Sequence, residues 1–96
     1  MAETTGTDDD LVVRRRKLKF RSWHRGMREM DLIMGRFADA FIDAMGEAEL
    51  DAYERLMETP DPDLLGWVLS EGPSPAEADS SMLQRVRAFH RAPRGS

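Results

Sequence analysis

The side chains that could do chemistry in this chain are mostly arginines and carboxylates. Of its 96 residues, 14 are Lys or Arg and 18 are Asp or Glu, whereas two are His and none is Cys. The lack of cysteine excludes a disulfide framework, a thiolate metal site and a Cys nucleophile. His24 and His90 are far apart in the sequence and lack the partner motif of a nucleophilic triad. We therefore predict no metal site, no catalytic residue and no enzymatic activity.

One short motif places opposite charges around a glycine. It reads Arg25-Gly26-Met27-Arg28-Glu29 and stands between two stretches with helical periodicity. Gly26 can allow a tight backbone turn, and Glu29 would favour the start of the helix that follows. Arg25 and Glu29 are four residues apart, a spacing at which a modest helical ion pair can form. From the residues alone, the motif is either a simple helix start or a contact surface.

A basic run precedes this motif and could bind phosphates. Its cations and aromatic residues are Arg14, Arg15, Arg16, Lys17, Lys19, Arg21, Phe20 and Trp23. Such cations can hold a phosphate backbone while the rings stack on bases. Residues 29–79, however, hold 14 acidic and two basic residues, which would repel a nucleic acid. A nucleic-acid or regulatory binding helix therefore remains the alternative to a solvated basic face, and we expect no nucleic-acid partner.

The length and composition favour one small domain. A chain of 96 residues has room for a single hydrophobic core. Its hydrophobic share of 41% suits a globular protein, and no stretch approaches the roughly 18 apolar residues of a membrane span. We expect a flexible acidic N-terminus over residues 1–10, one helical-bundle domain over residues 11–90 and a flexible tail over residues 91–96. Residues 1–10 resemble neither a secretory signal nor a transit peptide, so we expect a bacterial cytoplasmic protein without membrane insertion.

The elements that must position these residues are predicted to be helices. No stretch sustains the period-2 alternation of a strand, while Ala, Leu, Met, Glu and Arg dominate. We predict five helices, over about residues 11–22, 27–45, 47–58, 61–71 and 74–90. Apolar residues recur every three or four positions along the second: Met27, Met30, Met34, Phe37, Ala38, Phe41 and Met45. The fold class is therefore all-α, a compact five-helix bundle with this stripe in its core.

The ends of these helices are predicted from capping residues. The aspartates at positions 8–10 are placed to cap the first helix, and Gly46 to end the second in the left-handed conformation. Asp61, which precedes a proline, is typical of the N-cap of the fourth helix. Ser74 and Glu77 would form the capping box of the fifth.

Two stretches of the sequence resemble the signatures of a known family. The motif at residues 25–29, continued by residues 30–32 and 35–37, is similar to the Arg-Gly-x-x-Glu hallmark of the SdhE family of succinate dehydrogenase assembly factors. Residues 61–67 resemble the family's Asp-x-Asp-Leu-x-x-Trp segment. The resemblance covers about residues 14–90.

The resemblance implies an assembly factor rather than an enzyme. Members of the family are five-helix bundles that bind the flavoprotein subunit of succinate dehydrogenase, and in some bacteria fumarate reductase, and promote covalent attachment of FAD to a histidine of that subunit. Arg25, Gly26, Arg28, Glu29 and Asp31 would form the surface that binds this partner. The chain itself would hold no cofactor stably but act on the FAD of its client, and we expect it to be a monomer.

The resemblance also assigns finer roles. Arg25 would make charge-assisted contacts with the client, and Gly26 would allow close approach of its backbone. Asp61, Asp63 and Trp67 are either secondary contacts or structural residues; we favour helix capping for both aspartates and core packing for the tryptophan. The resemblance assigns no role to the basic first helix. A second contact for an acidic surface of the client is compatible with the resemblance, and in the alternative this helix is the nucleic-acid or regulatory binding element.

Overall fold

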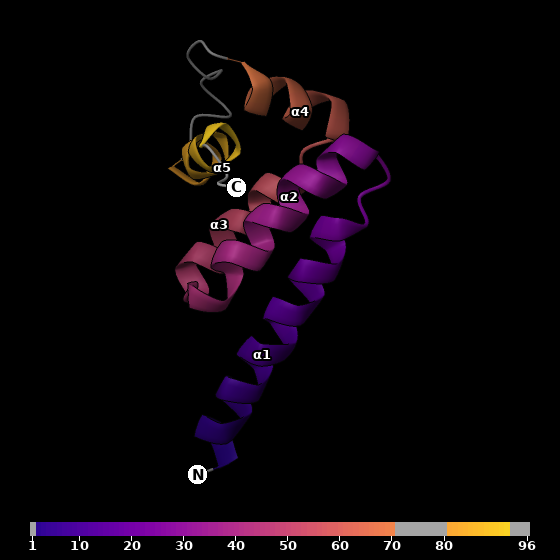
Figure 1. Cartoon of the computed structure of the whole chain (residues 1–96). Helices are drawn as coiled ribbons and strands as arrows, with labels where there is room; N and C mark the ends of the chain where they lie inside the picture. The colour runs from indigo at the N-terminus through magenta and orange to yellow at the C-terminus, as the bar shows by residue number, and fades with distance from the viewer. Residues whose placement is uncertain (1, 71–80, 93–96) are drawn as a thin grey trace.

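The computed structural model describes residues 2–70 and 81–92. These residues contain five α-helices and one short 3-10 helix, and no strand occurs among them. In chain order the elements are α1 (Ala2–Trp23), α2 (Arg28–Phe41), η1 (Ile42–Ala44), α3 (Glu47–Met57), α4 (Asp61–Leu69) and α5 (Ser81–Arg91). α1 and α2 form an antiparallel hairpin, and α5 lies against α2, α3 and α4 (Figure 1). The predicted all-α, five-helix bundle is confirmed.

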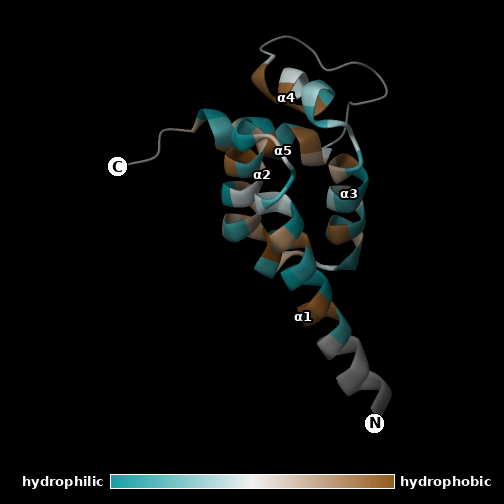
Figure 2. Cartoon of the chain, turned by 90° about the vertical axis from the view of Figure 1, so that its right-hand side faces the viewer, coloured by the Kyte–Doolittle hydropathy of each residue, from teal (hydrophilic) through white to brown (hydrophobic). Residues whose placement is uncertain are grey.

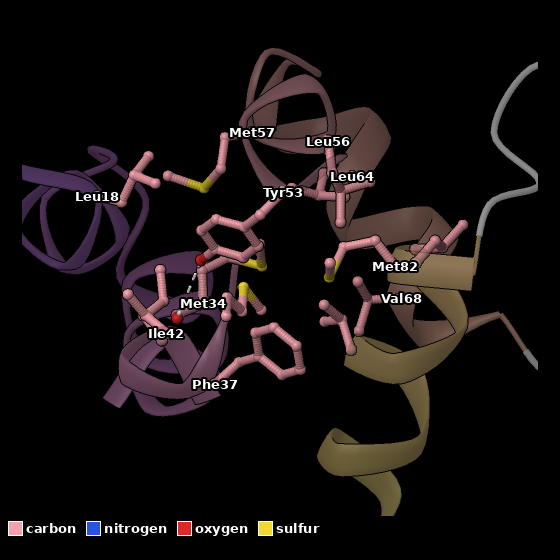
Figure 3. Close-up of a cluster of buried hydrophobic side chains, with 14 of the residues drawn as sticks. Leu18, Met34, Phe37, Ile42, Tyr53, Leu56, Met57, Leu64, Val68 and Met82 are labelled. Atoms are coloured by element: carbon pink, nitrogen blue, oxygen red, sulfur yellow. Dashed lines mark hydrogen bonds between the residues drawn. The ribbon is translucent and has the colours of Figure 1, made fainter. Parts of the chain in front are cut away.

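The hydrophobic core lies where α2 meets the other helices. Because its apolar residues recur at helical spacing, α2 turns one side inward, and Met30, Met34 and Phe37 are fully buried. The other elements supply the rest of the core: Leu18, Ile42, Met45, Leu50, Tyr53, Leu56, Met57, Leu64, Val68, Met82, Leu83 and Val86. Figure 3 shows side chains from all five helices converging there, and in Figure 2 hydrophobic and hydrophilic residues both occur along the coloured part of each helix. The predicted methionine stripe is therefore core.

One polar network lies inside this core. Ser22 Oγ donates to the carbonyl of Leu18 (2.7 Å), which leaves it free to accept a hydrogen bond from the Tyr53 hydroxyl (2.6 Å). The same hydroxyl lies 3.4 Å from the carbonyl of Met34 (Figure 3). Burial raises the pKa of Tyr53 to about 12, because the phenolate would lose its hydration there. The network thus connects α1, α2 and α3 through groups that depend on a neutral tyrosine.

Two helix ends differ from the prediction. α1 begins at Ala2 instead of near Leu11, so the aspartates at positions 8–10 lie within the helix and do not cap it. No proline interrupts this stretch, and nothing therefore forces the helix to begin later. α2 ends at Phe41, where η1 tightens the chain before Met45. The apolar pattern continues through the 3-10 turn. It therefore predicted a longer second helix than the structure shows.

Gly46 does not act as the predicted left-handed cap. Its φ is −85°, and it is the N-cap of α3, with its N–H donated to Glu49 Oε1 (3.2 Å). This bond satisfies one backbone donor near the start of the helix, as a reciprocal cap does. The predicted capping box of Ser74 and Glu77, and the end of the fourth helix near residues 71–73, lie outside the described residues.

Candidate functional site

Arg25 is held inside the protein by partners far away in the sequence. Its Nε donates to Asp61, Nη1 donates to the carbonyl of Met57 (2.9 Å) and Nη2 donates to the carbonyl of Thr59 (2.8 Å). Only 9% of its side chain and 16% of that of Asp61 are exposed. The predicted ion pair of Arg25 with Glu29 is therefore replaced by one with Asp61, and the guanidinium ties the α1–α2 junction to the turn between α3 and α4.

Gly26 and Asp31 shape the loop that follows. Gly26 has a φ of +106°, a conformation that side chains other than glycine adopt only under strain. A Cβ at this position would have no atom within 4 Å, so the glycine is required by the backbone conformation and not by space within this chain. Asp31 Oδ1 accepts the backbone N–H groups of Arg25 (2.6 Å) and Gly26 (3.2 Å). Asp31 thus fixes the turn from within.

Arg28 and Glu29 are the exposed charged residues of the motif. They begin α2, and Glu29 stands at the edge of a hollow of about 300 Å³ between α2, α4 and α5. Its lining residues are Glu29, Leu32, Ile33, Arg36, Leu65, Leu69 and His90. Leu32 and Leu69 are 37% and 53% exposed. The outward side of the motif is therefore a charged edge beside an apolar hollow, an arrangement suited to binding a partner's apolar side chain.

The three residues of the second predicted segment have different positions. Asp61 is the first residue of α4 and accepts from Arg25, so its prediction as a helix cap is wrong; Pro60 is the N-cap. Asp63 is exposed in the first turn, where its negative charge interacts favourably with the helix dipole. Its side chain makes no cap hydrogen bond. Trp67 is partly buried and packs against the core, as predicted.

Trp23 and Gly35 form a close contact behind the motif that sequence reasoning missed. The Trp23 ring lies directly over Gly35 of α2, and its Nε1–H donates to Asp39 (3.2 Å to Oδ2). A Cβ on Gly35 would lie 2.2 Å from the ring, which is impossible without movement. A glycine within a helix is the available signal, because it costs about 1 kcal/mol relative to alanine and therefore indicates a packing or functional requirement.

Three of the six cations in the basic run bind other residues of the chain. Arg14 binds Asp51 and Glu54 of α3, Arg15 donates to the carbonyl of Met45 (2.8 Å), and Lys19 binds Asp43 (2.8 Å). The hydrogen bonds from Arg14 hold the pKa of Glu54 below its usual value. These contacts join α1 to η1 and α3, and two of the three cations, Arg14 and Lys19, are already paired with carboxylates.

Neither a metal centre nor a membrane span is found where the structure is described. In residues 2–70 and 81–92, His, Asp and Glu side chains do not gather into a group of three or more that could ligate a metal. None of the helices in these ranges has the length and apolar character needed to cross a bilayer.

Comparison with known proteins gives the site a context. The family model described as "flavinator of succinate dehydrogenase" matches residues 16–90, which include the motif and every helix except the first part of α1 and the last residue of α5. The chain belongs to the succinate dehydrogenase flavinator family. No solved structure matches it.

Relatives in the flavinator family come from bacteria and eukaryotes. The chain is 42% identical over 88 residues to the FAD assembly factor SdhE of Acetobacter pasteurianus, covering 92% of this chain and 81% of that protein. It is 34% identical over 64 residues to the protein of the same name from Haemophilus ducreyi, covering 67% of this chain and 78% of that one. The mitochondrial succinate dehydrogenase assembly factor 2 of Dictyostelium discoideum is 38% identical over 73 residues. This match covers 76% of the chain but only about half, 52%, of the Dictyostelium protein.

Proposed function

We propose that this chain binds the flavoprotein subunit of succinate dehydrogenase and promotes the covalent attachment of FAD to it. The observation that carries the proposal is the exposed motif edge, Gly26 to Glu29, held in one conformation beside an apolar hollow within the region that matches the flavinator family. The names of the relatives, FAD assembly factor and succinate dehydrogenase assembly factor, support the same client. Fumarate reductase is proposed as a second client of the same surface.

Some residues of the motif would shape the surface, and others would contact the client. Arg25 and Asp31 act as positioning residues, because their polar atoms are used to hold the loop. Arg28, Glu29 and the backbone of Gly26 are exposed and would make the contacts. An apolar side chain of the client would enter the hollow beside Glu29, where burial of apolar area contributes most of the affinity and the charged edge sets the orientation.

The chain would promote the reaction by positioning its client rather than by supplying a reacting group. Flavin chemistry belongs to the cofactor, and a helper need only favour the geometry in which the acceptor histidine meets the flavin ring. The sequence contains no Gly-x-Gly-x-x-Gly loop to hold a dinucleotide pyrophosphate, which supports FAD being held by the client. We therefore propose a monomeric, non-catalytic factor without a cofactor of its own.

A matched pair of charge reversals tests the surface. Glu29 and Glu47 are both exposed and both lie in the first turn of a helix, so reversal to Lys costs each helix a similar dipole interaction. Purified flavoprotein subunit is incubated with FAD and each variant, and covalent flavin is followed by its fluorescence in a denaturing gel. Glu29→Lys should slow flavinylation about tenfold, equivalent to 1.4 kcal/mol, because it reverses the charge beside the hollow.

Glu47→Lys serves as the control. It should promote flavinylation at the rate of the unmodified chain, because Glu29 lies at the start of α2, whereas Glu47 lies beyond the other end of that helix, at the start of α3. Circular dichroism establishes that both variants are folded. Equal rates for the two folded variants would contradict the assignment of the motif edge as the client-binding surface.

A further inference from the structure

The outward side of α1 carries a stripe of cations and apolar groups that the motif surface does not use. It consists of five residues of α1 and the residue that directly follows the helix, at successive spacings of one or three residues, and all six are exposed: Val13, Arg16, Lys17, Phe20, Arg21 and His24. We call these six residues the α1 stripe. Phe20 is 64% exposed and Val13 43%. Their spacing places them along one side of the helix, away from the buried Leu18 and Ser22.

The three cations of the α1 stripe form no salt bridge within the part of the chain that the structure describes. Arg16, Lys17 and Arg21 form no ion pair with any described residue, whereas Arg14 and Lys19, on other sides of the same helix, are paired with carboxylates. Residues 11–28 contain no acidic residue at all. The stripe therefore presents three cations without a salt-bridge partner among the described residues, on a protein whose net charge is −4.

The surface between these cations is apolar and hollowed. Arg16, Lys17, Phe20 and Arg21 line a hollow of about 440 Å³, floored by the aromatic ring and the alkyl parts of the basic side chains. The ring of Phe20 stacks on that of His24 at a centroid distance of 4.1 Å, and His24 Nδ1 donates to the Phe20 carbonyl (2.8 Å). These contacts restrict the exposed aromatic ring, and restriction before binding lowers the entropy cost of association.

The α1 stripe adjoins Arg25, the first residue of the motif at the α1–α2 junction. A second hollow, of about 280 Å³, is lined by Phe20, Arg21 and His24 of the stripe together with Arg25 and Met57. Arg25 is the residue that ties the motif loop to the α3–α4 turn. A partner bound at the motif would therefore have a direct path along the surface to the stripe.

We propose that the α1 stripe is a second docking surface for the flavoprotein client and binds an acidic segment of it, with an apolar side chain of that segment resting on Phe20. This inference rests on the proposed function. An acidic protein segment fits better than nucleic acid, because half of the basic run is bound internally and residues 29–79 carry 14 acidic against two basic residues. Carboxylates would meet Arg16, Lys17 and Arg21, and the hollow would take the apolar side chain.

Affinities of the full-length chain for purified flavoprotein subunit, measured by isothermal titration calorimetry, test this proposal. Phe20→Ala and Arg16→Glu should each weaken binding about tenfold, as expected for an interface aromatic residue and a reversed charge. The matched controls are Val12→Ala, which removes an exposed apolar side chain from α1 outside the stripe, and Arg55→Glu, which reverses an exposed cation on α3. Both controls should bind within about twofold of the unmodified chain, an effect below 0.5 kcal/mol.

The possible results separate the stripe from the motif surface. If both stripe variants bind normally while Glu29→Lys binds weakly, the stripe proposal is overturned and the proposed function stands. If the unmodified chain does not bind the flavoprotein subunit, both are overturned. Tighter binding of random-sequence duplex DNA than of the flavoprotein, with loss in Phe20→Ala, would assign the stripe to nucleic acid and overturn the proposal as well.

Discussion

At the scale of single residues, Arg25 is a motif residue whose polar atoms are used inside the protein. Its guanidinium bonds to Asp61 and to the carbonyls of Met57 and Thr59, and 9% of its side chain is exposed. A charge so far removed from water is stable only while its partners are in place. The Gly26 loop is therefore held to the α3–α4 turn by this one side chain.

Removal of the Arg25 side chain should destabilise the whole fold. Arg25→Ala leaves Asp61 and two carbonyls without their donor, so we expect the free energy of unfolding to fall by about 3 kcal/mol. Urea denaturation followed by circular dichroism measures the change. Arg28→Ala, at an exposed position in the same motif, should change it by less than about 0.5 kcal/mol. Equal stability of the two variants would show that the internal bonds of Arg25 contribute little.

The sequence predicted the motif as a unit but not how its residues divide their roles. Gly26 as a turn and Glu29 in the first turn of a helix follow from local preferences, and both are found. The partner of Arg25 is Asp61, 36 residues further along the chain. No local rule connects these two positions, because the contact exists only once α3 and α4 have folded against the α1–α2 junction.

At the scale of the elements, the α1–α2 hairpin depends on one close contact between a ring and a helix. Trp23 lies over Gly35, and its indole N–H binds Asp39 of the same helix. Only a glycine lets the ring approach α2 this closely. The contact holds the two helices that flank the motif loop and so fixes the direction in which α2 presents Glu29.

Two glycine substitutions of the same kind should therefore act in opposite directions. Gly35→Ala places a Cβ 2.2 Å from Trp23 and should lower the free energy of unfolding by about 1 to 3 kcal/mol through overpacking. Gly66→Ala, in α4, meets no atom within 4 Å and should raise it by about 0.4 to 1 kcal/mol, because alanine restricts the unfolded chain. Thermal melts of both variants measure these changes. A destabilised Gly66→Ala or an unaffected Gly35→Ala would contradict the packing described here.

The helices were predictable where the apolar pattern is long and local. The α2 stripe from Met30 to Phe37 and the start of α3 after Gly46 follow from periodicity and from acids in the first turn. The ends were less predictable: α1 continues back to Ala2, and the α2 pattern runs on through η1. Apolar spacing barely distinguishes an α-helix from the 3-10 turn that follows it, because both bury every third or fourth residue.

At the scale of the whole molecule, α1, α2 and α3 meet at a buried hydroxyl pair. Tyr53 donates to Ser22 Oγ, and burial raises the pKa of Tyr53 to about 12 from an ordinary value of 10.0. Because the folded state holds this proton more tightly, the unfolded state loses it first as the pH rises. The stability contributed by Tyr53 is complete below pH 10 and is lost progressively toward pH 12.

Alkaline titration should expose this dependence. Relative to Tyr53→Phe, which cannot ionise, the unmodified chain should lose about 2 kcal/mol of additional stability between pH 10 and pH 12. Tyr53 is the one tyrosine of the chain, so the ultraviolet absorbance of tyrosinate reports on it alone. The absorbance should rise near pH 12 in the folded protein. A rise near pH 10 with native circular dichroism would contradict the buried, hydrogen-bonded state of the hydroxyl.

Polar contacts also join the helices across the molecule. Internal ion pairs and carbonyl contacts from Arg14, Arg15 and Lys19 fix α1 to the bundle, and Arg25 fixes the motif loop to α4. Contacts that order a surface before binding reduce the entropy cost of association. We propose that this surface serves to promote flavinylation of a client.

The most direct test is the intact mass of purified, FAD-free succinate dehydrogenase flavoprotein subunit after incubation with FAD, with and without this chain. We predict that mass spectrometry finds the subunit heavier by one covalently bound FAD when the chain is present, and largely unmodified over the same time in its absence. Equal covalent FAD in both samples would contradict the account.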